Sequence, residues 1–138
     1  IEKMTTLPAN FKLLIAGDGE ELNNLKNLIN ELELESKVIL LGYHSDVIGF
    51  LNGIDIYVSN SLGEGLPYSL LEALSMKVPC IVSNVSGHDE IIEKSYMFGV
   101  DDNEEFKNLI IKKQDTLNIF NESSFDLDRN FKKVVSNY

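Results

Sequence analysis

The chain has 138 residues, the size of one compact domain, with 43% hydrophobic residues to build a core. It carries 12 lysine and arginine residues against 22 aspartate and glutamate residues, a formal net charge of −10. This balance argues against nucleic acid or an anionic membrane surface as a direct partner, since both require clustered cations. The single cysteine, Cys80, excludes an internal disulfide, and no apolar run reaches the ~20 residues of a membrane span. The expected location is cytoplasmic.

The first half of the chain alternates apolar runs with a helical pattern. Leu13–Ala16 is expected to form a buried strand that ends at the turn Gly17-Asp18-Gly19. From Glu20 to Leu34, apolar residues recur at three- and four-residue spacing, which predicts an amphipathic helix. Val38–Leu41 predicts a second strand, and Asp46–Gly53 a short helix.

The second half continues the same alternation. Strands are expected at Ile56–Val58, Cys80–Val82 and Tyr96–Phe98, and helices at Tyr68–Met76 and Glu104–Lys113. Residues 114–138 are expected to form a C-terminal helical tail. Apolar strands separated by amphipathic helices predict a single domain over residues 1–138. It would be a Rossmann-like, three-layer α/β/α fold with a mostly parallel sheet of about five strands.

Glycine-rich and polar segments follow four of the predicted strands. These segments are residues 17–19, 42–44, 60–67 and 83–90. Because ligands of parallel α/β folds bind beyond the carboxyl ends of the strands, we expect these loops to line one binding edge.

The segment from Asn60 to Val82 carries the most specific chemistry. Pro67 precedes a predicted helix, and Gly65 suits a tight turn with close backbone approach. The amides of Tyr68, Ser69 and Leu70 at this helix start favour a phosphate. Glu64 and Glu72 are carboxylates, which accept hydrogen bonds from neighbouring hydroxyls such as those of a sugar or a ribose. Together they predict a nucleotide-sugar site.

The run Glu-Gly-Leu-Pro-x4-Glu-Ala-Leu at residues 64–74, followed by Val-Pro-Cys-Ile-Val, resembles a known family motif. It is similar to the Glu-x7-Glu segment of the group 1 (family 4) retaining glycosyltransferases, which have the GT-B architecture of two facing Rossmann-like domains. The resemblance continues, in the family's order, through residues 11–21, 37–43, 55–61 and 83–92. It therefore covers roughly residues 10–113.

The resemblance implies a role for each matching residue. Glu64 would contact the donor sugar as the catalytic candidate, and Glu72 would hold the ribose. The backbone of the same segment would hold the diphosphate; its residues are Gly65, Leu66, Pro67, Tyr68, Ser69 and Leu70. Gly42 and Tyr43 would lie against the base, and Gly17 and Gly19 beneath the nucleotide.

The implied function is donor binding for transfer of a glycosyl group from a nucleoside-diphosphate sugar to an acceptor hydroxyl, with retention. The family's usual setting is bacterial polysaccharide or surface-glycan synthesis. The acceptor, a glycan or lipid-linked saccharide, would bind the family's N-terminal domain, which also carries any peripheral attachment to the inner face of the membrane. No cofactor and no metal are expected.

Two departures from the family pattern stand out. The Arg and Lys that neutralise the leaving diphosphate are absent, and Lys77 stands where the family usually has glycine. Residues 1–10 match a remnant of the family's first helix, so we expect the chain to lack the first strand. Strands 13–16 and 56–58 would then pair directly, or another copy would fill the gap. On this basis we expect weak donor affinity and no transfer by the isolated chain.

Several alternatives stay open from the residues alone. A GT-B-fold sugar-nucleotide epimerase, a phosphorylase-like enzyme or a non-enzymatic receiver-like module would share the α/β pattern. A dinucleotide fingerprint is rejected because Leu22 occupies its third glycine position. His44 and His88 are expected at the surface, and Cys80 in the core. The acidic residues at 101–105 are expected to cap a helix start.

Overall fold

The computed structural model describes the backbone of residues 1–117 and the side chains of residues 1–113. Within this range the chain divides into two compact units, Ile1–Val47 (unit 1) and a second that begins at Ile48 (unit 2). Most of the predicted C-terminal tail, residues 118–138, lies outside the described range. That residues 1–138 act as a single domain stays a prediction. None of the helices described up to residue 117 is long and apolar enough to cross a bilayer.

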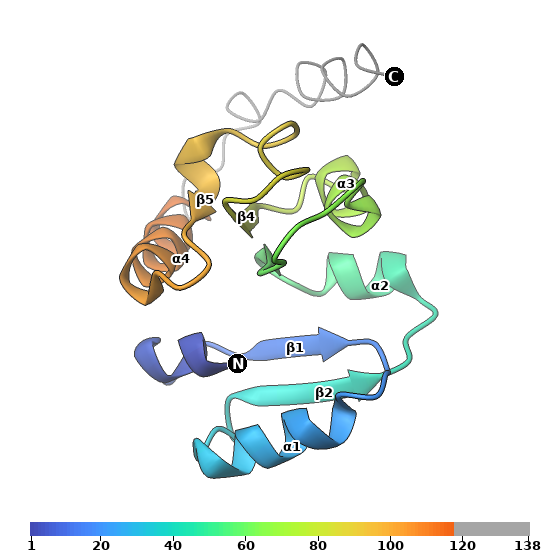
Figure 1. Cartoon of the computed structure of the whole chain (residues 1–138), viewed down its shortest axis with the longest axis vertical. Helices are drawn as coiled ribbons and strands as arrows, with labels where there is room; N and C mark the ends of the chain where they lie inside the picture. The colour runs from blue at the N-terminus through green and yellow to red at the C-terminus, as the bar shows by residue number, and fades with distance from the viewer. Residues whose placement is uncertain (118–138) are drawn as a thin grey trace. The chain divides into compact units, whose positions relative to one another are not determined.

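Unit 1 is a β-α-β arrangement preceded by a 3₁₀ helix, η1 (Glu2–Thr6). Strand β1 (Leu13–Ala16) pairs in parallel with β2 (Val38–Gly42), and α1 (Leu22–Glu31) lies along this two-stranded sheet (Figure 1). Along the predicted apolar stripe of α1, Ile29 is buried and Leu25 and Leu28 are half-buried. The small core of this unit consists of Met4, Leu7, Ile29, Leu34 and Val38.

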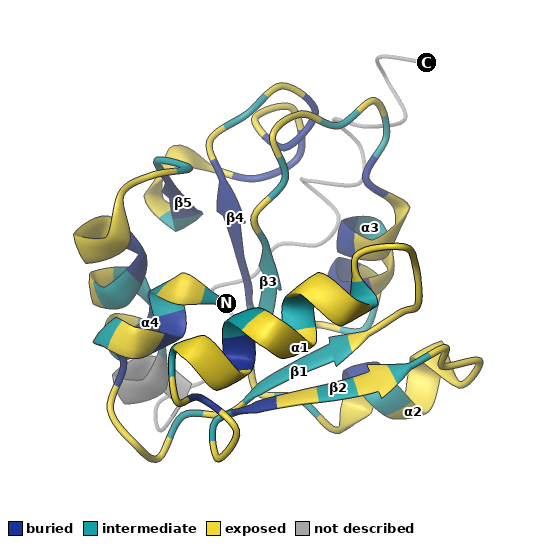
Figure 2. Ribbon diagram, turned by 60° about the horizontal axis from the view of Figure 1, so that its bottom comes forward, coloured by how far each residue is buried: buried dark blue, intermediate teal, exposed yellow. Residues whose placement is uncertain are grey.

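Unit 2 holds a three-stranded parallel sheet in the order β3-β4-β5, formed by Tyr57–Ser59, Cys80–Ser83 and Met97–Phe98. The central strand β4 is buried over its whole length, which Figure 2 shows as a dark blue arrow. Helices α3 (Tyr68–Ser75) and α4 (Asn103–Leu117) flank this strand on two sides, while α2 (Val47–Asn52) begins at the boundary with unit 1. The 3₁₀ helix η2 (Lys94–Tyr96) directly precedes β5.

The end of α3 explains how the chain tolerates lysine where the family usually has glycine. Lys77 adopts a left-handed backbone with φ of 60°. The Lys77 N–H donates to the Leu74 carbonyl at 3.0 Å and the Val78 N–H to the Ala73 carbonyl at 3.0 Å. This hydrogen-bond pair is the Schellman helix ending, which normally uses glycine at the left-handed position. The turn is therefore built in the glycine conformation, with a side chain that strains it.

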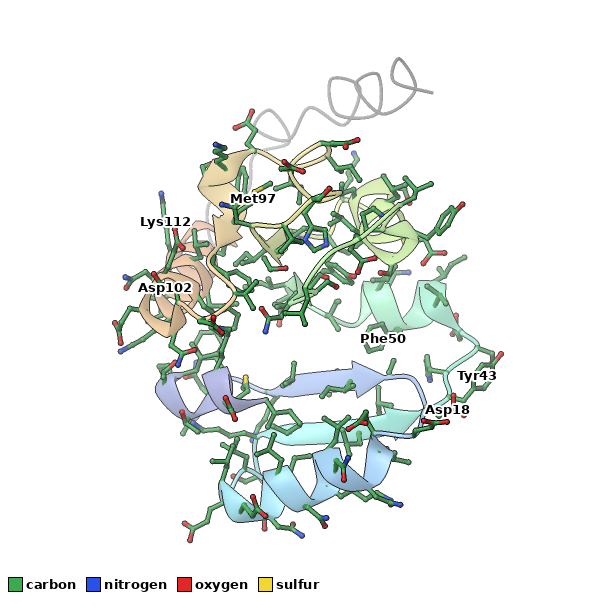
Figure 3. The ribbon with its side chains drawn as sticks, viewed as in Figure 1. Asp18, Tyr43, Phe50, Met97, Asp102 and Lys112 are labelled. Atoms are coloured by element: carbon green, nitrogen blue, oxygen red, sulfur yellow. The ribbon has the colours of Figure 1, made fainter. Side chains whose placement is uncertain are left out.

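The start of α4 confirms the predicted role of the acidic cluster. The Asp102 carboxylate accepts a hydrogen bond from the Glu105 N–H at 2.8 Å, and the Glu105 carboxylate accepts one from the Gly99 N–H at 2.8 Å. Two backbone donors near the helix start are thereby satisfied by side chains. Figure 3 labels Asp102 at this position.

The predicted fold class is confirmed: the described chain is a parallel α/β fold with five strands near their expected positions. The prediction of one sheet is wrong, since β1-β2 and β3-β4-β5 are separate sheets. Direct pairing of β1 with β3 is wrong for the same reason. β1 lies in unit 1 and pairs with β2, which follows it after one crossover helix. β3 lies in unit 2 and pairs with β4, which also follows after one crossover helix. That a second copy fills a gap between them stays a prediction.

Candidate functional site

In unit 2, the loops that follow β3 and β4 meet at the carboxyl ends of these parallel strands. The Glu64 N–H donates to the Ser86 carbonyl at 3.1 Å, which ties the first loop to the second. Gly87 has φ of +89°, and a Cβ atom placed on it would lie 2.4 Å from the Glu64 carbonyl oxygen. Only glycine allows this approach, because any side chain would overlap the backbone that carries Glu64.

The Glu64 side chain is half-buried and is held by a serine three residues earlier. The Ser61 hydroxyl donates to Glu64 Oε1 at 2.5 Å. Ser59 Oγ lies 3.2 Å from Ser61 Oγ. Because the single Ser61 proton is used on Glu64, Ser59 is the donor in this second contact. Sequence reasoning missed Ser61, although a serine three positions before the first motif glutamate was visible.

Behind this loop lies a buried polar pair, Ser83 and His88, each fully shielded from solvent. The Ser83 hydroxyl donates to the Ser61 carbonyl at 2.7 Å, and His88 Nδ1 lies 2.9 Å from the Ser83 carbonyl. A carbonyl only accepts, so we assign the imidazole proton to Nδ1. His88 Nε2 is buried and has no hydrogen-bond partner among the described residues.

The prediction that His88 lies at the surface is wrong. The turn after β4, closed by the His88 N–H on the Val85 carbonyl at 3.2 Å, directs the ring behind the strand end. There the ring donates a hydrogen bond from Nδ1 to the Ser83 carbonyl, and this contact stabilises the buried position of His88. His44, in contrast, is exposed as expected.

The start of α3 lies next to Glu64, immediately after Pro67. The Leu70 side chain is fully buried in the core, so only the backbone of this residue could contact a ligand at the helix start. The Ser69 hydroxyl lies 2.7 Å from the Tyr57 hydroxyl, whose pKa is raised by burial. Glu72 is exposed on the same helix. The two motif glutamates therefore differ, one held in a hydrogen-bond network and the other open to solvent.

The amides expected to be open for an anion are partly engaged within the loop. The Tyr68 N–H donates to the Leu66 carbonyl at 3.0 Å, and the Leu70 N–H to the Pro67 carbonyl at 3.1 Å. A bound phosphate would therefore compete with two local bonds.

The fold itself does not require glycine at position 65. Gly65 has no positive φ, and a Cβ atom on it would meet no protein atom within 4 Å. The predicted close approach of the Gly65 backbone would therefore be to a ligand and not to another part of the fold.

In unit 1, the predicted glycines lie at the ends of β1 and β2. The Gly17 N–H donates to the Gly42 carbonyl at 2.8 Å. Both have positive φ, +138° and +67°, whereas Gly19 has ordinary backbone geometry. Tyr43 is 76% exposed, and Figure 3 shows its side chain at this end of the unit together with Asp18. The structure thus brings the predicted residues together in two groups, one in each unit.

Cys80 is 3% exposed within the core of unit 2, as predicted. Burial raises the pKa of its thiol to about 12, so it is not a nucleophile near neutral pH. No group of three or more His, Cys, Asp or Glu side chains that could hold a metal ion exists in the described part of the chain.

A family model described as "Glycosyl transferases group 1" matches residues 1–115. The chain belongs to the group 1 glycosyltransferases. Over 116 residues it is 34% identical to an Escherichia coli protein named UDP-Gal:alpha-D-GlcNAc-diphosphoundecaprenol alpha-1,3-galactosyltransferase. This match covers 80% of the chain and 30% of the relative. A second relative, N-acetyl-alpha-D-glucosaminyl L-malate synthase of Bacillus anthracis, is 37% identical over 82 residues, covering 59% of the chain and 22% of the relative. The matched part of this chain thus spans about a fifth to a third of the length of these relatives.

Solved structures of similar fold agree with this membership. Anabaena HepE in complex with UDP superimposes with a TM-score of 0.76 at 18% identity, covering 99% of this chain and 43% of that protein. The catalytic domain of Helicobacter pylori cholesterol-alpha-glucosyltransferase superimposes with a TM-score of 0.77 at 15% identity, covering 99% and 87%. These similarities show the fold alone, which is the Rossmann-like fold found in GT-B structures.

Proposed function

We propose that this chain is the donor-binding part of a glycosyltransferase that uses a nucleoside-diphosphate sugar. The observation that carries the proposal is the arrangement at the carboxyl ends of β3 and β4. A half-buried carboxylate, Glu64, is fixed beside the start of α3, and a second carboxylate, Glu72, is open to solvent on that helix. Carboxylates accept hydrogen bonds from sugar hydroxyls, and a helix start favours phosphate.

The proposed roles follow from this arrangement. Glu64 contacts donor-sugar hydroxyls, Glu72 holds the ribose, and the backbone around Gly65–Leu70 receives the diphosphate. In unit 1, Gly42 and the exposed Tyr43 ring would lie against the nucleotide base, and Gly17 and Gly19 beneath the nucleotide. An aromatic ring that is 76% exposed is available for stacking on a base.

A uracil nucleotide is the first candidate donor. One relative is named for UDP-Gal, and the structure of HepE contains UDP. Transfer with retention, an acceptor glycan or lipid-linked saccharide, a role in bacterial surface-glycan synthesis and a cytoplasmic location are parts of the same proposal. Membership of the group 1 family argues against the receiver-like, epimerase and phosphorylase-like alternatives.

Donor binding is further proposed to need no metal ion. In this proposal the helix start and the backbone amides hold the diphosphate directly. The affinity for UDP should therefore be the same with added Mg²⁺ and with excess EDTA. A tenfold or larger loss of affinity in EDTA would contradict this part of the proposal.

Calorimetric titration of the chain with UDP, GDP and their glucose conjugates tests donor binding. Glu72→Ala should weaken binding by ~1–3 kcal/mol, roughly 5- to 150-fold in Kd, because hydrogen bonds from the ribose are lost. Glu31→Ala is the matched control: it is also an exposed helical glutamate, but it ends α1 at the opposite end of the helix from Gly19. Equal affinity of the Glu72→Ala and Glu31→Ala variants would remove Glu72 from the site.

Transfer is proposed for a longer polypeptide that carries this sequence, because the chain spans 30% of the Escherichia coli relative. The isolated chain is expected to bind the donor weakly and to transfer no sugar. Turnover of UDP-galactose or UDP-glucose by the chain alone, followed as UDP release in the presence of lipid-linked N-acetylglucosamine, would contradict this expectation.

A further inference from the structure

The Glu64 carboxylate is held by two separable sets of contacts. Its backbone is fixed by the N–H bond to the Ser86 carbonyl at 3.1 Å and by the close approach of Gly87. Its side chain is fixed by the Ser61 hydroxyl, which donates to Oε1 at 2.5 Å. Loss of the Ser61 hydroxyl would therefore free the carboxylate while leaving the main chain of Glu64 in place.

Ser61 is itself connected to the buried core. Its carbonyl accepts the Ser83 hydroxyl at 2.7 Å across 22 residues of chain. Ser83 ends the central strand β4, and its own carbonyl accepts the His88 Nδ1 proton at 2.9 Å. Both Ser83 and His88 are fully buried, so the rigid part of the network lies in the core and its outer end is the Ser61 hydroxyl.

A hydrogen bond to a charged oxygen is shorter and stronger than one between neutral groups. The contact between the Ser61 hydroxyl and the Glu64 carboxylate is a hydrogen bond of this kind. A hydroxyl has one proton to donate, and Ser61 uses it on Glu64, whereas its contact with Ser59 is made as an acceptor. The single hydroxyl proton of Ser61 is therefore used in the hydrogen bond that orients the Glu64 carboxylate.

We infer that Ser61 is a positioning residue that fixes the orientation of the Glu64 carboxylate, and that Ser83 and His88 support it from the core. The consequence for the donor rests on the proposed function. A carboxylate held in one orientation accepts hydrogen bonds from the sugar hydroxyls without first being ordered. Ser61 should therefore affect the additional affinity that the sugar gives to a UDP-sugar, and not the affinity for UDP itself.

The first test needs no ligand. The midpoint of urea unfolding is measured for the chain, for Ser61→Ala, for Glu64→Ala and for the double variant. The inference expects the two changes to be coupled, so that Ser61→Ala shifts the midpoint in the parent chain and has no further effect once Glu64 is alanine. Equal shifts in both backgrounds would overturn the inference, whatever the chain binds.

The second test compares Kd for UDP with Kd for UDP-glucose and UDP-galactose. Ser61→Ala should reduce the preference for a UDP-sugar over UDP by about fivefold, the equivalent of one hydrogen bond, and leave Kd for UDP within about twofold. Ser61→Thr retains the hydroxyl and should restore the preference. Ser86→Ala is the control, since Ser86 is exposed and contributes only its carbonyl to Glu64.

The outcomes separate the inference from the proposed function. If Ser61→Ala weakens UDP and UDP-sugars equally, or acts fully in the Glu64→Ala background, Ser61 has a merely structural role and the inference is wrong. If the parent chain binds UDP-sugars no better than UDP, or binds neither, the proposed sugar contact of Glu64 fails. The ligand-free coupling then still decides whether Ser61 positions the carboxylate.

Discussion

Replacing Gly87 by alanine should damage the Glu64 loop more than any other single methyl group added to it. A Cβ atom at Gly87 would lie 2.4 Å from the Glu64 carbonyl oxygen and 3.0 Å from the Glu64 carbonyl carbon and Cβ. Both loops are bonded here through the Glu64 N–H and the Ser86 carbonyl, so neither moves alone. Relief of the overlap requires a displacement of about 1 Å of one loop, since ordinary contact lies near 3.4 Å.

Three terms set the expected magnitude. The φ of +89° at Gly87 is strained for alanine, at roughly 1–3 kcal/mol, and overpacking adds roughly 1–3 kcal/mol. Alanine restricts the unfolded chain and returns ~0.4–1 kcal/mol. The free energy of unfolding of Gly87→Ala should therefore fall by roughly 1–6 kcal/mol, as measured by urea denaturation with the slope compared between variants.

Gly63→Ala is the matched control in the loop that carries Glu64. Gly63 has no positive φ, and a Cβ atom on it would meet nothing within 4 Å. Its stability should change by less than about 0.5 kcal/mol, as for an open surface site. Equal stability of the Gly87→Ala and Gly63→Ala variants would refute the close approach of the two loops.

Three further predictions concern the elements around the site. Lys77→Gly should raise the free energy of unfolding by ~0.5–1 kcal/mol in urea denaturation, because it relieves the left-handed backbone at the end of α3. Asp102→Ala should lower it by ~1 kcal/mol through loss of the α4 cap, whereas the exposed neighbour Asp101→Ala should not. Burial raises the pKa of Cys80 from 9.0 to about 12, so the unfolded chain ionises first. The free energy of unfolding should therefore fall above about pH 9. Urea denaturation at about pH 8 and at about pH 10 measures this fall, and Cys80→Ala should remove the part that comes from the thiol.

The local elements of the fold could be predicted from the sequence because each is encoded by nearby residues. The leucine spacing of α1 and the acidic cap of α4 act within a few positions, and both appear as predicted. The division into two sheets could not be predicted, since it depends on which strand edges pair over long distances.

The hydrogen-bond network that supports Glu64 could not be predicted from the sequence for a similar reason. Ser61 and Ser83 are 22 residues apart, and His88 joins them only after the turn that follows β4 has formed. In the sequence, His88 stands in a polar loop, which predicts exposure. Its burial follows from tertiary hydrogen bonds, which no local pattern encodes. The requirement for Gly87 is tertiary too, because the atom that excludes a side chain belongs to Glu64.

The central claim is that the loop and helix start around Glu64 bind a nucleotide sugar, and amide NMR titration of the chain with UDP-galactose tests it most directly. We predict that the largest chemical-shift changes fall at residues 61–72 and 86–88, with further changes at Gly17, Gly42 and Tyr43, and that Glu72→Ala reduces them at equal ligand concentration. Amide shifts that stay unchanged at millimolar ligand, or that move only in α1 and α4, would contradict the account.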